Sequence, residues 1–284
     1  MARMSWREAC NLDHTLTSLE GFFSIPPGYA QTLTGGLTNR CWKIIAEDGP
    51  AFVWRPNTPI TQAFSISRFQ EYQILSAIES SHIGPKPLFI NEQGLLVEWI
   101  EGESLMDGLP FESLLKTQIK IHNLSTARIP VAPFSFTARV DHYWLQLKAE
   151  YKTDQCTNLY QSWRTAPNLA DVGVVLCHFD LAGYNMVKTQ QGHRVIDWEY
   201  ASIADPRLDL ALSIEVAGEK PLESVYRYCQ LRKIEGVDDW VEGVMAWHPR
   251  ISMMAMLWYL LAHQLWGDDN YLHQADKLKN GLCS

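Results

Sequence analysis

Short runs of apolar and β-branched residues, each followed by a turn signal, predict a small β-sheet in the first hundred residues. The runs that fit strands are residues 31–33, 40–45, 51–55, 88–90 and 95–99. Asp48-Gly49-Pro50 and residues 91–94 supply tight turns between neighbouring runs. Apolar residues near helical spacing over residues 65–80 predict one helix here, and Pro26-Pro27 ends an earlier helical pattern.

Glu101-Gly102 marks the one plausible domain boundary, with a sheet-rich unit before it and a helix-rich unit after it. Helices are expected near residues 111–124, 140–151, 211–217, 223–231, 237–247, 251–266 and 270–282. The chain is therefore expected to have an α+β fold, with a five-strand lobe over residues 1–100 and a larger helical lobe over residues 101–284.

The composition is that of a globular protein and indicates the kind of partner it binds. Of the 284 residues, 46% are hydrophobic and 20% are charged, and the formal net charge is −8. This negative charge argues against nucleic acid as the main partner and is compatible with a small cationic substrate. No feature of the sequence points to an obligate protein partner.

Cysteine usage and the N-terminal sequence indicate a cytoplasmic protein outside the membrane. The six cysteines are scattered without a C-x-x-C pair, and residues 1–13 lack the apolar core of a signal peptide. The most apolar stretch, residues 253–265, is too short to span a bilayer. Reduced thiols are expected rather than disulfides or a zinc site.

Four polar residues within residues 177–210 have the order and spacing that a magnesium-dependent phosphoryl-transfer site requires. Asp180 and Asn185 are close enough to share one rigid loop. The apolar runs and polar turn between Asn185 and Asp197 predict a β-hairpin that returns Asp197 to the side of Asn185. Asn185 and Asp197 would then hold Mg²⁺ while Asp180 orients an attacking hydroxyl. His178 is expected to support the loop backbone.

Two further motifs fit a kinase but are weak on their own. The Gly35-Gly36 pair would let the backbone approach a phosphate closely, although it also suits an ordinary hairpin turn. Arg55 ends a predicted strand and Glu71 lies in the following helix, which fits a cation–carboxylate pair pointed at nucleotide phosphates. The alternative for Arg55 and Glu71 is two unrelated surface charges.

Several segments carry motifs that are informative in combination. They are HFDLAGYN (178–185), IDWEYA (196–201), DPRLDL (205–210), LTGGLTNR (33–40), FVWRP (52–56), LLVEWIEG (95–102) and IHNL (121–124). Together they resemble the aminoglycoside phosphotransferase and choline kinase superfamily, a branch of the protein-kinase-like fold. The resemblance covers about residues 30–282 and implies a two-lobe kinase that uses ATP and Mg²⁺.

The resemblance also implies roles for individual residues. It makes Asp180 the catalytic base and makes Asn185 and Asp197 the metal ligands. Arg55 becomes the clamp on the nucleotide phosphates, with Glu71 as its partner. The phosphate loop would include Gly35, Gly36, Thr38 and Asn39.

Two more elements of a kinase follow from the same resemblance. Backbone groups from Glu98 to Ile100 would read adenine, and Asp209 would be a buried carboxylate that braces the catalytic loop. No long segment separates Asp197 from Asp205-Pro206, so control by phosphorylation of an activation loop, and a protein substrate, are not expected.

The acceptor site is expected among aromatic residues near the C-terminus. Aromatic faces beside a carboxylate are a physical solution for binding a cation. The resemblance singles out Glu215 as the carboxylate that faces an ammonium group, and we predict Trp258 as its aromatic neighbour. The alternative is that aromatic residues at helical spacing simply fill the core.

Several acceptors remain open. Residues 265–276 are most similar to the end of bacterial thiamine kinases, whereas LTGGLTNR and IDWEY are shared with bacterial choline kinases. Thiamine is therefore favoured, with choline or ethanolamine close behind. An aminoglycoside would require several carboxylates, for which the candidates are Asp238, Asp239, Asp268 and Asp269. The non-enzyme alternative is a nucleotide-binding scaffold, which the intact catalytic and metal-binding residues disfavour.

Overall fold

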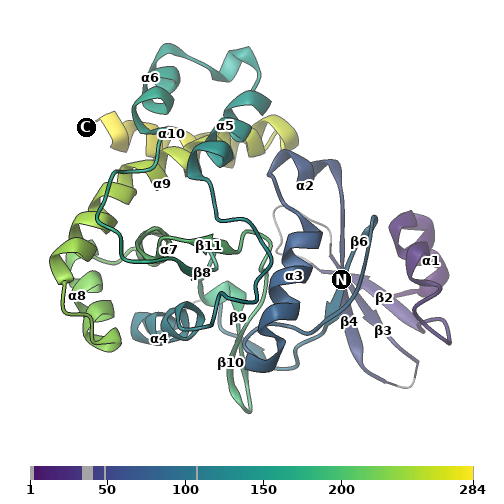
Figure 1. The fold of residues 1–284 in the computed structure, drawn as a ribbon. Coiled ribbons are helices and arrows are strands. Elements are labelled where there is room, and N and C mark those ends of the chain that lie inside the picture. The colour runs from purple at the N-terminus through teal and green to yellow at the C-terminus, as the bar shows by residue number, and fades with distance from the viewer. Residues whose placement is uncertain (1–2, 34–40, 48, 107, 284) are drawn as a thin grey trace.

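The computed structural model describes residues 3–33, 41–47, 49–106 and 108–283. An antiparallel sheet forms one side of the molecule and a helical part forms the other (Figure 1). This arrangement confirms the α+β class. The division into lobes 1–100 and 101–284 stays a prediction.

The sheet has six strands in the order β1-β2-β3-β4-β6-β5, and all neighbours are antiparallel. Their bounds are β1 Met4–Ser5, β2 Tyr29–Thr32, β3 Trp42–Ile45, β4 Ala51–Pro56, β5 Pro87–Asn91 and β6 Gly94–Glu98. The predicted number of five is wrong by one because β1, with two residues, is too short to produce an alternating pattern.

The two faces of the sheet pack against different helices. Alternate residues of a strand point to opposite faces, so Leu96 of β6 packs in one hydrophobic cluster and Leu95 in another. On the Leu96 face lie α1 (Trp6–Leu12) and the 3₁₀ helix η1 (His14–Leu19). On the other face lies α3 (Arg68–Ile78), between the sheet and the helical part (Figure 1).

Gly94, at the start of β6, lies against the backbone of β4. A Cβ atom here would be 2.5 Å from the Arg55 carbonyl oxygen and 2.8 Å from the Trp54 ring. We therefore expect Gly94→Ala to lower the free energy of unfolding by about 1–3 kcal/mol, the usual cost of overpacking. Urea denaturation measures the change. Gly21→Ala is the matched control, because no atom lies within 4 Å of the added Cβ, and equal midpoints for both variants would contradict the expectation.

The helical part follows the sheet along the chain. Its helices are α4 Phe111–His122, α5 Phe136–Gln146, α6 Asp154–Trp163, α7 Pro206–Ala217, α8 Pro221–Arg232, α9 Val237–Trp266 and α10 Asp269–Cys283. The sequence pattern does not predict α6 or the short α2 Pro59–Ala63, and it includes the separate 3₁₀ turns η2 Glu79–Ser81 and η3 Ala149–Tyr151 at the ends of longer predicted helices. It also places the end of α5 too late, because Leu147 has an extended backbone that ends the helix.

α9 is one helix of 30 residues, whereas the sequence predicts two helices on either side of Pro249. A proline in a helix interior removes a backbone hydrogen bond and costs about 3 kcal/mol. Buried side chains continue on both sides of it, with Trp247 before and Ile251 after. Their packing offsets the cost, and the helix continues. No helix in the described part of the chain is both long and apolar enough to cross a membrane.

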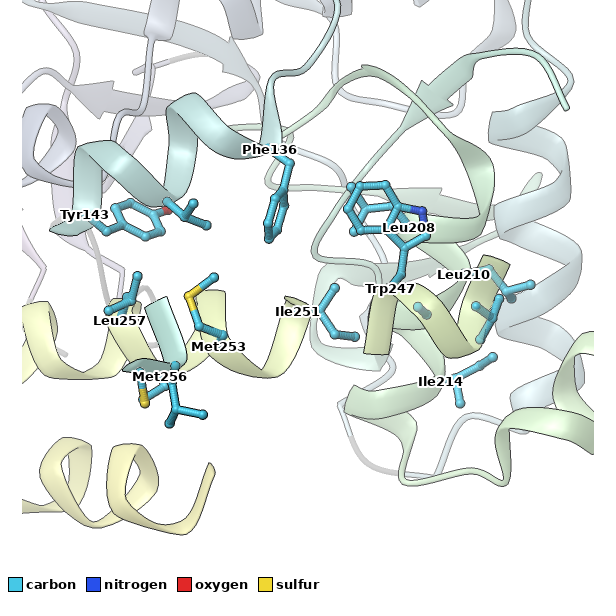
Figure 2. Packing of buried hydrophobic residues seen from close by; sticks show 14 of the residues in the cluster. Phe136, Tyr143, Leu208, Leu210, Ile214, Trp247, Ile251, Met253, Met256 and Leu257 are labelled. Atoms are coloured by element: carbon cyan, nitrogen blue, oxygen red, sulfur yellow. The ribbon is translucent and has the colours of Figure 1, made fainter. Parts of the chain in front are cut away.

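The core of the helical part surrounds α9. Figure 2 shows side chains of α5, α7 and α9 that fill it: Phe136, Tyr143, Leu208, Leu210, Ile214, Trp247, Ile251, Met253, Met256 and Leu257. Each of these residues is at most 5% exposed, and burying a side chain of this size contributes about 1.5–3 kcal/mol. The core therefore fixes α7, which carries Asp209, against α9.

Short strands hold the loops that carry the predicted catalytic residues. They are β7 Glu103–Ser104, β8 Val175–Cys177, β9 Met186–Thr189, β10 Gly192–Val195 and β11 Ser202–Ala204. β9 and β10 form an antiparallel hairpin, which confirms the hairpin predicted between Asn185 and Asp197. β8 pairs with β11, and β7 pairs with β9. Backbone hydrogen bonds thus fix the segments that enter and leave both loops.

Candidate active site

The candidate catalytic loop, residues 178–185, begins directly after β8 and is supported by the side chain of His178. This residue is fully buried, and its Nε2 lies 3.1 Å from the Ile196 carbonyl oxygen. The Asp180 N–H donates to its Nδ1 at 3.3 Å. Burial lowers the pKa of His178, so the ring is neutral and Nε2 carries the proton that Ile196 accepts. The side chain contacts loop backbone, as the sequence predicts.

Asp209 lies in the first turn of α7, fully buried behind the same loop. Its Oδ1 accepts a hydrogen bond from the Phe179 N–H at 2.7 Å. Its Oδ2 lies 2.8 Å from His122 Nε2 and accepts from Gln118 Nε2 at 3.0 Å. Burial alone would raise the pKa of Asp209, but these bonds lower it overall. The ionised carboxylate holds Phe179 in its left-handed conformation, with φ of 67°.

Asp180 has both carboxylate oxygens hydrogen-bonded. Tyr184 Oη donates to Oδ1 at 2.7 Å, and Asn185 Nδ2 donates to Oδ2 at 2.9 Å. Burial and the nearby Asp197 carboxylate raise the pKa of Asp180 to about 7. A carboxylate with a pKa near neutrality is suited to take a proton from a hydroxyl.

The β9–β10 hairpin brings Asn185 and Asp197 together. Asn185 ends the 3₁₀ turn η4 (Gly183–Asn185) just before β9, and Asp197 follows shortly after β10. The Ile196 N–H donates to the Asn185 carbonyl oxygen at 2.9 Å and joins the two loops. Asp197 has a φ of 65°, a left-handed conformation that aspartate tolerates better than most residues.

The side chains of Asn185 and Asp197 fit a hard cation such as Mg²⁺. Asn185 Nδ2 is engaged by Asp180, so its Oδ1 is left for a ligand, and no described residue donates to that oxygen. Amide and carboxylate oxygens are the ligands that Mg²⁺ prefers. A cation beside Asp197 would also relieve the repulsion that raises the pKa of Asp180.

Another group of potential metal ligands has a different explanation. His122, Cys177 and Asp209 are buried, with one ligand atom each within 4.8 Å of the others, the one such group in the described residues. Both ring nitrogens of His122 are already engaged, by Tyr228 Oη at 2.5 Å and by Asp209. Burial keeps the pKa of Cys177 well above its ordinary value, so the thiol is neutral. This group supports the catalytic loop.

Arg55 and Glu71 form an ion pair, as the sequence predicts, within a larger buried cluster. Arg55 Nε lies 3.0 Å from Glu71 Oε1. Arg55 Nη2 lies 2.5 Å from Asp197 Oδ1 and 3.0 Å from Glu199 Oε2. Burial alone would lower the pKa of Arg55, but Asp197 and Glu71 hold it well above its ordinary value. The cluster joins β4 and α3 to the loop after β10.

Arg68 is a member of this ion cluster that the sequence pattern does not reveal. It is 1% exposed, and its Nη1 lies 2.6 Å from Glu71 Oε2 and 3.0 Å from Glu199 Oε2. Two arginines therefore face three carboxylates. Burial raises the pKa of Glu199, whereas Arg55 and Arg68 outweigh burial and lower the pKa of Asp197. The spacing of three residues between Arg68 and Glu71 was the one local signal of this contact.

The residues expected to read adenine lie at the end of β6. The Glu98 N–H donates to the Lys86 carbonyl oxygen at 2.9 Å, and the Glu98 carboxylate pairs with Arg194. Ile100 is 7% exposed, and its N–H donates to none of the described residues. A backbone N–H is a strong donor, so this group is available to an adenine nitrogen. The adenine-reading role of Glu98 and Ile100 stays a prediction.

Four predicted phosphate-binding residues lie outside the described part of the chain, and their role stays a prediction: Gly35, Gly36, Thr38 and Asn39. The described chain resumes at Cys41. Burial raises the pKa of this thiol, and the charges of Arg55 and Arg68 act against that rise. Cys41 is therefore close to the ion cluster.

Trp258, on α9, lies in an aromatic cluster within electrostatic reach of Asp180. Its ring centroid is 5.3 Å from that of Tyr259 and 6.1 Å from that of Tyr271. Its Nε1 donates to Tyr200 Oη at 3.1 Å. Burial and the charge of Asp180 raise the pKa of Tyr259. The aromatic cluster, Trp258, Tyr259 and Tyr271, is thus both packed together and close to the candidate base.

Glu215, predicted to share the acceptor site with Trp258, lies elsewhere. It is in the last turn of α7, and its Oε2 lies 3.0 Å from His248 Nε2. His248 and Trp258 are ten positions apart on α9, about 15 Å along the helix. Hydrogen bonding to His248 lowers the pKa of Glu215. The structure does not bring Glu215 to the aromatic cluster, and its substrate role stays a prediction without a geometric basis.

The four aspartates considered for a polycationic acceptor do not converge either. Asp238 and Asp239 lie in the first turn of α9, whereas Asp268 and Asp269 follow its C-terminal end. A helix of 30 residues is about 45 Å long. These side chains are therefore at opposite ends of the helix and cannot form one pocket.

The chain is similar in sequence to known phosphotransferases. The profile of the phosphotransferase enzyme family, APH, matches residues 30–240. The chain belongs to this family. The matched segment includes the catalytic loop and the Arg55–Glu71 pair, and it confirms the superfamily resemblance. This phosphotransferase is therefore an enzyme, a small-molecule kinase.

Relatives of this phosphotransferase include a curated kinase and solved structures. The thiamine kinase of Shigella boydii serotype 4 is 26% identical over 249 residues, which cover 86% of this chain and 87% of the relative. Plasmodium vivax ethanolamine kinase has a TM-score of 0.74 at 16% identity, over 98% of this chain and 89% of that one. Choline kinase LicA from Streptococcus pneumoniae has a TM-score of 0.68 at 20% identity, over 94% and 96%. These likenesses confirm the two-lobe, protein-kinase-like fold.

Proposed function

We propose that this phosphotransferase transfers the γ-phosphoryl group of ATP to the hydroxyl of a small cationic metabolite, with thiamine favoured. The observation that carries the proposal is the convergence of Asp180, Asn185 and Asp197 near the aromatic cluster. The thiamine kinase relative is 26% identical to this chain, against 16% for the ethanolamine kinase and 20% for the choline kinase, which favours thiamine over choline or ethanolamine.

In the proposed reaction Asp180 orients the acceptor hydroxyl and takes its proton as the oxygen attacks the γ-phosphorus. The bond from the γ-phosphorus to the bridging oxygen breaks, and ADP leaves. Asn185 and Asp197 would hold Mg²⁺, which when bound neutralises phosphate charge. Catalysis then depends on positioning and charge neutralisation, without a covalent enzyme intermediate.

Residues of the six-stranded sheet and of α3 would bind the nucleotide. Arg55 would contact its phosphates while Glu71 fixes the guanidinium in place. Arg55 is 8% exposed, so it offers a charge that is oriented by its neighbours rather than free in solvent. The Ile100 N–H would bind the adenine ring.

The acceptor would lie between Asp180 and the aromatic cluster. Burial and the charge of Asp268 raise the pKa of Tyr271. The Asp268 carboxylate therefore places a negative charge near the aromatic cluster. Ring and quaternary cations are attracted to aromatic faces, with a gain of about 0.5–2 kcal/mol per contact. A cationic alcohol would thus be held by its charge while its hydroxyl reaches Asp180.

A coupled assay of ADP release tests the function across thiamine, choline, ethanolamine, homoserine and an aminoglycoside. We expect Mg²⁺-dependent turnover that thiamine stimulates most. Trp258→Leu should raise the KM for that acceptor by about tenfold and leave the KM for ATP nearly unchanged. Trp6→Leu, on the outer face of the sheet, is the matched control and should leave both constants unchanged.

The possible outcomes separate the alternatives. Stimulation by choline or ethanolamine alone would contradict thiamine and keep the cationic acceptor class. Stimulation by the aminoglycoside alone would contradict the proposed acceptor class. A protein that binds ATP but turns it over with none of these compounds would behave as a nucleotide-binding scaffold.

A further inference from the structure

Tyr184 combines an exposed ring with a hydroxyl that contacts the candidate base. It lies in η4 next to Asn185, and it is 45% exposed. Its hydroxyl donates to Asp180 Oδ1 at 2.7 Å.

The two carboxylate oxygens of Asp180 differ in what they can bind. Oδ2 accepts from Asn185 Nδ2, which also donates to the Asp180 carbonyl oxygen at 2.8 Å. The amide keeps this orientation so that its own oxygen can face a metal. Oδ1 is therefore the oxygen that an acceptor hydroxyl would use, and it is the oxygen that Tyr184 contacts.

We propose that the Tyr184 hydroxyl is an internal substitute for the acceptor hydroxyl. It pairs with Asp180 Oδ1 until an acceptor displaces it, and it thereby limits transfer of the γ-phosphoryl group to water. The inference rests on the proposed function, in which Asp180 is the base of an ATP-dependent kinase.

Hydrolysis and productive transfer require the same contact with Asp180. In either reaction an oxygen nucleophile bonds to the γ-phosphorus, the bond to the bridging oxygen breaks, the nucleophile's proton passes to Asp180, and ADP leaves. Water can follow this path only within hydrogen-bonding distance of the base. The phenol at 2.7 Å occupies one acceptor position of Oδ1 and so competes with water there. An exposed ring makes few contacts, so an acceptor bound at the aromatic cluster can displace Tyr184.

The test is ATP hydrolysis by the full chain with Mg²⁺ and ATP but no acceptor. Tyr184→Phe keeps the ring and removes only the hydroxyl. We expect it to hydrolyse ATP about five times faster than the natural protein, the effect of losing one ordinary hydrogen bond. Tyr226→Phe is the matched control, since Tyr226 is 50% exposed on α8, and should change nothing. Adding Asp180→Asn to Tyr184→Phe should abolish the extra hydrolysis.

With an acceptor present, Tyr184→Phe should lower the KM for the acceptor and leave kcat nearly unchanged. If Tyr184 instead only held Asp180 in position, kcat would fall and hydrolysis would not rise. Either of those results overturns the proposal. Failure of the proposed function is distinguishable, because a protein that phosphorylates none of the tested alcohols can still show the rise in hydrolysis.

Discussion

Asp180→Asn should lower kcat for phosphoryl transfer by about a thousandfold while ATP binding stays largely intact. A positioned general base contributes about a hundred- to ten-thousandfold, and an asparagine side chain cannot take up the hydroxyl proton. Its oxygen can still accept from Tyr184, although its amide nitrogen replaces the oxygen that accepts from Asn185 Nδ2. Asn185 Nδ2 keeps its bond to the carbonyl oxygen of residue 180, so the loop should keep its shape. ADP release at saturating ATP and acceptor measures kcat, and calorimetry measures the affinity for ATP.

Glu242→Gln is the matched control for this loss of a carboxylate. Glu242 is exposed on α9, and the substitution should change neither kcat nor ATP affinity. If Asp180→Asn kept more than a tenth of the natural kcat, Asp180 would not be the general base of the reaction. Equal urea midpoints for the variant and the natural protein would show that the effect is chemical.

The convergence of the candidate catalytic and metal-binding residues could be predicted because these residues are close together along the chain. Asp180 and Asn185 share one loop, and a single hairpin separates Asn185 from Asp197. Such a hairpin is specified by its own turn and by two short apolar runs. Geometry that is encoded within one segment can be inferred without knowing the rest of the fold.

The ion cluster could be predicted only in part because it is assembled from distant segments. Arg68 and Glu199 are 131 positions apart, and arginine is almost never fully buried unless it is paired. What buries Arg68 is the packing of α3 against the loop after β10. Gln70 Nε2, which donates to the Ala201 carbonyl oxygen at 2.9 Å, is another contact between these elements.

For the predicted acceptor site, the helical spacing of aromatic residues does not distinguish a core position from a pocket position. Trp247 and Trp258 are both on α9, yet Trp247 lies in the core (Figure 2), whereas Trp258 is only partly buried and makes an edge-to-face contact with Tyr259, whose pKa burial and the charge of Asp180 raise. The sequence cannot separate these two environments, because both residues recur at helical spacing. The surroundings of Glu215 are not encoded locally either, because its contact with His248 depends on how α7 packs against α9.

Arg68→Met should lower the free energy of unfolding by about 3–5 kcal/mol, the cost of breaking a buried charge pair. The substitution leaves Glu71 and Glu199 buried without one of their two cations. Methionine is flexible and fills much of the vacated volume, so the loss should come mainly from charge. Urea denaturation measures it. Lys220→Met, which breaks an exposed pair with Glu223, is the matched control and should cost less than about 1 kcal/mol.

Combining Arg68→Met with Glu199→Gln separates charge from packing. The double variant loses one cation and one carboxylate, so the cluster keeps its original net charge. Arg68 Nε and Nη2 have no hydrogen-bond partner in the described structure, so their removal leaves no further group unsatisfied. We therefore expect the double variant to recover at least half of the lost stability, a coupling that a double-mutant cycle measures directly. If the losses of unfolding free energy in the two single variants simply added in the double variant, Arg68 would act through packing. If Arg68→Met alone left the urea midpoint unchanged, Arg55 alone would balance the buried carboxylates.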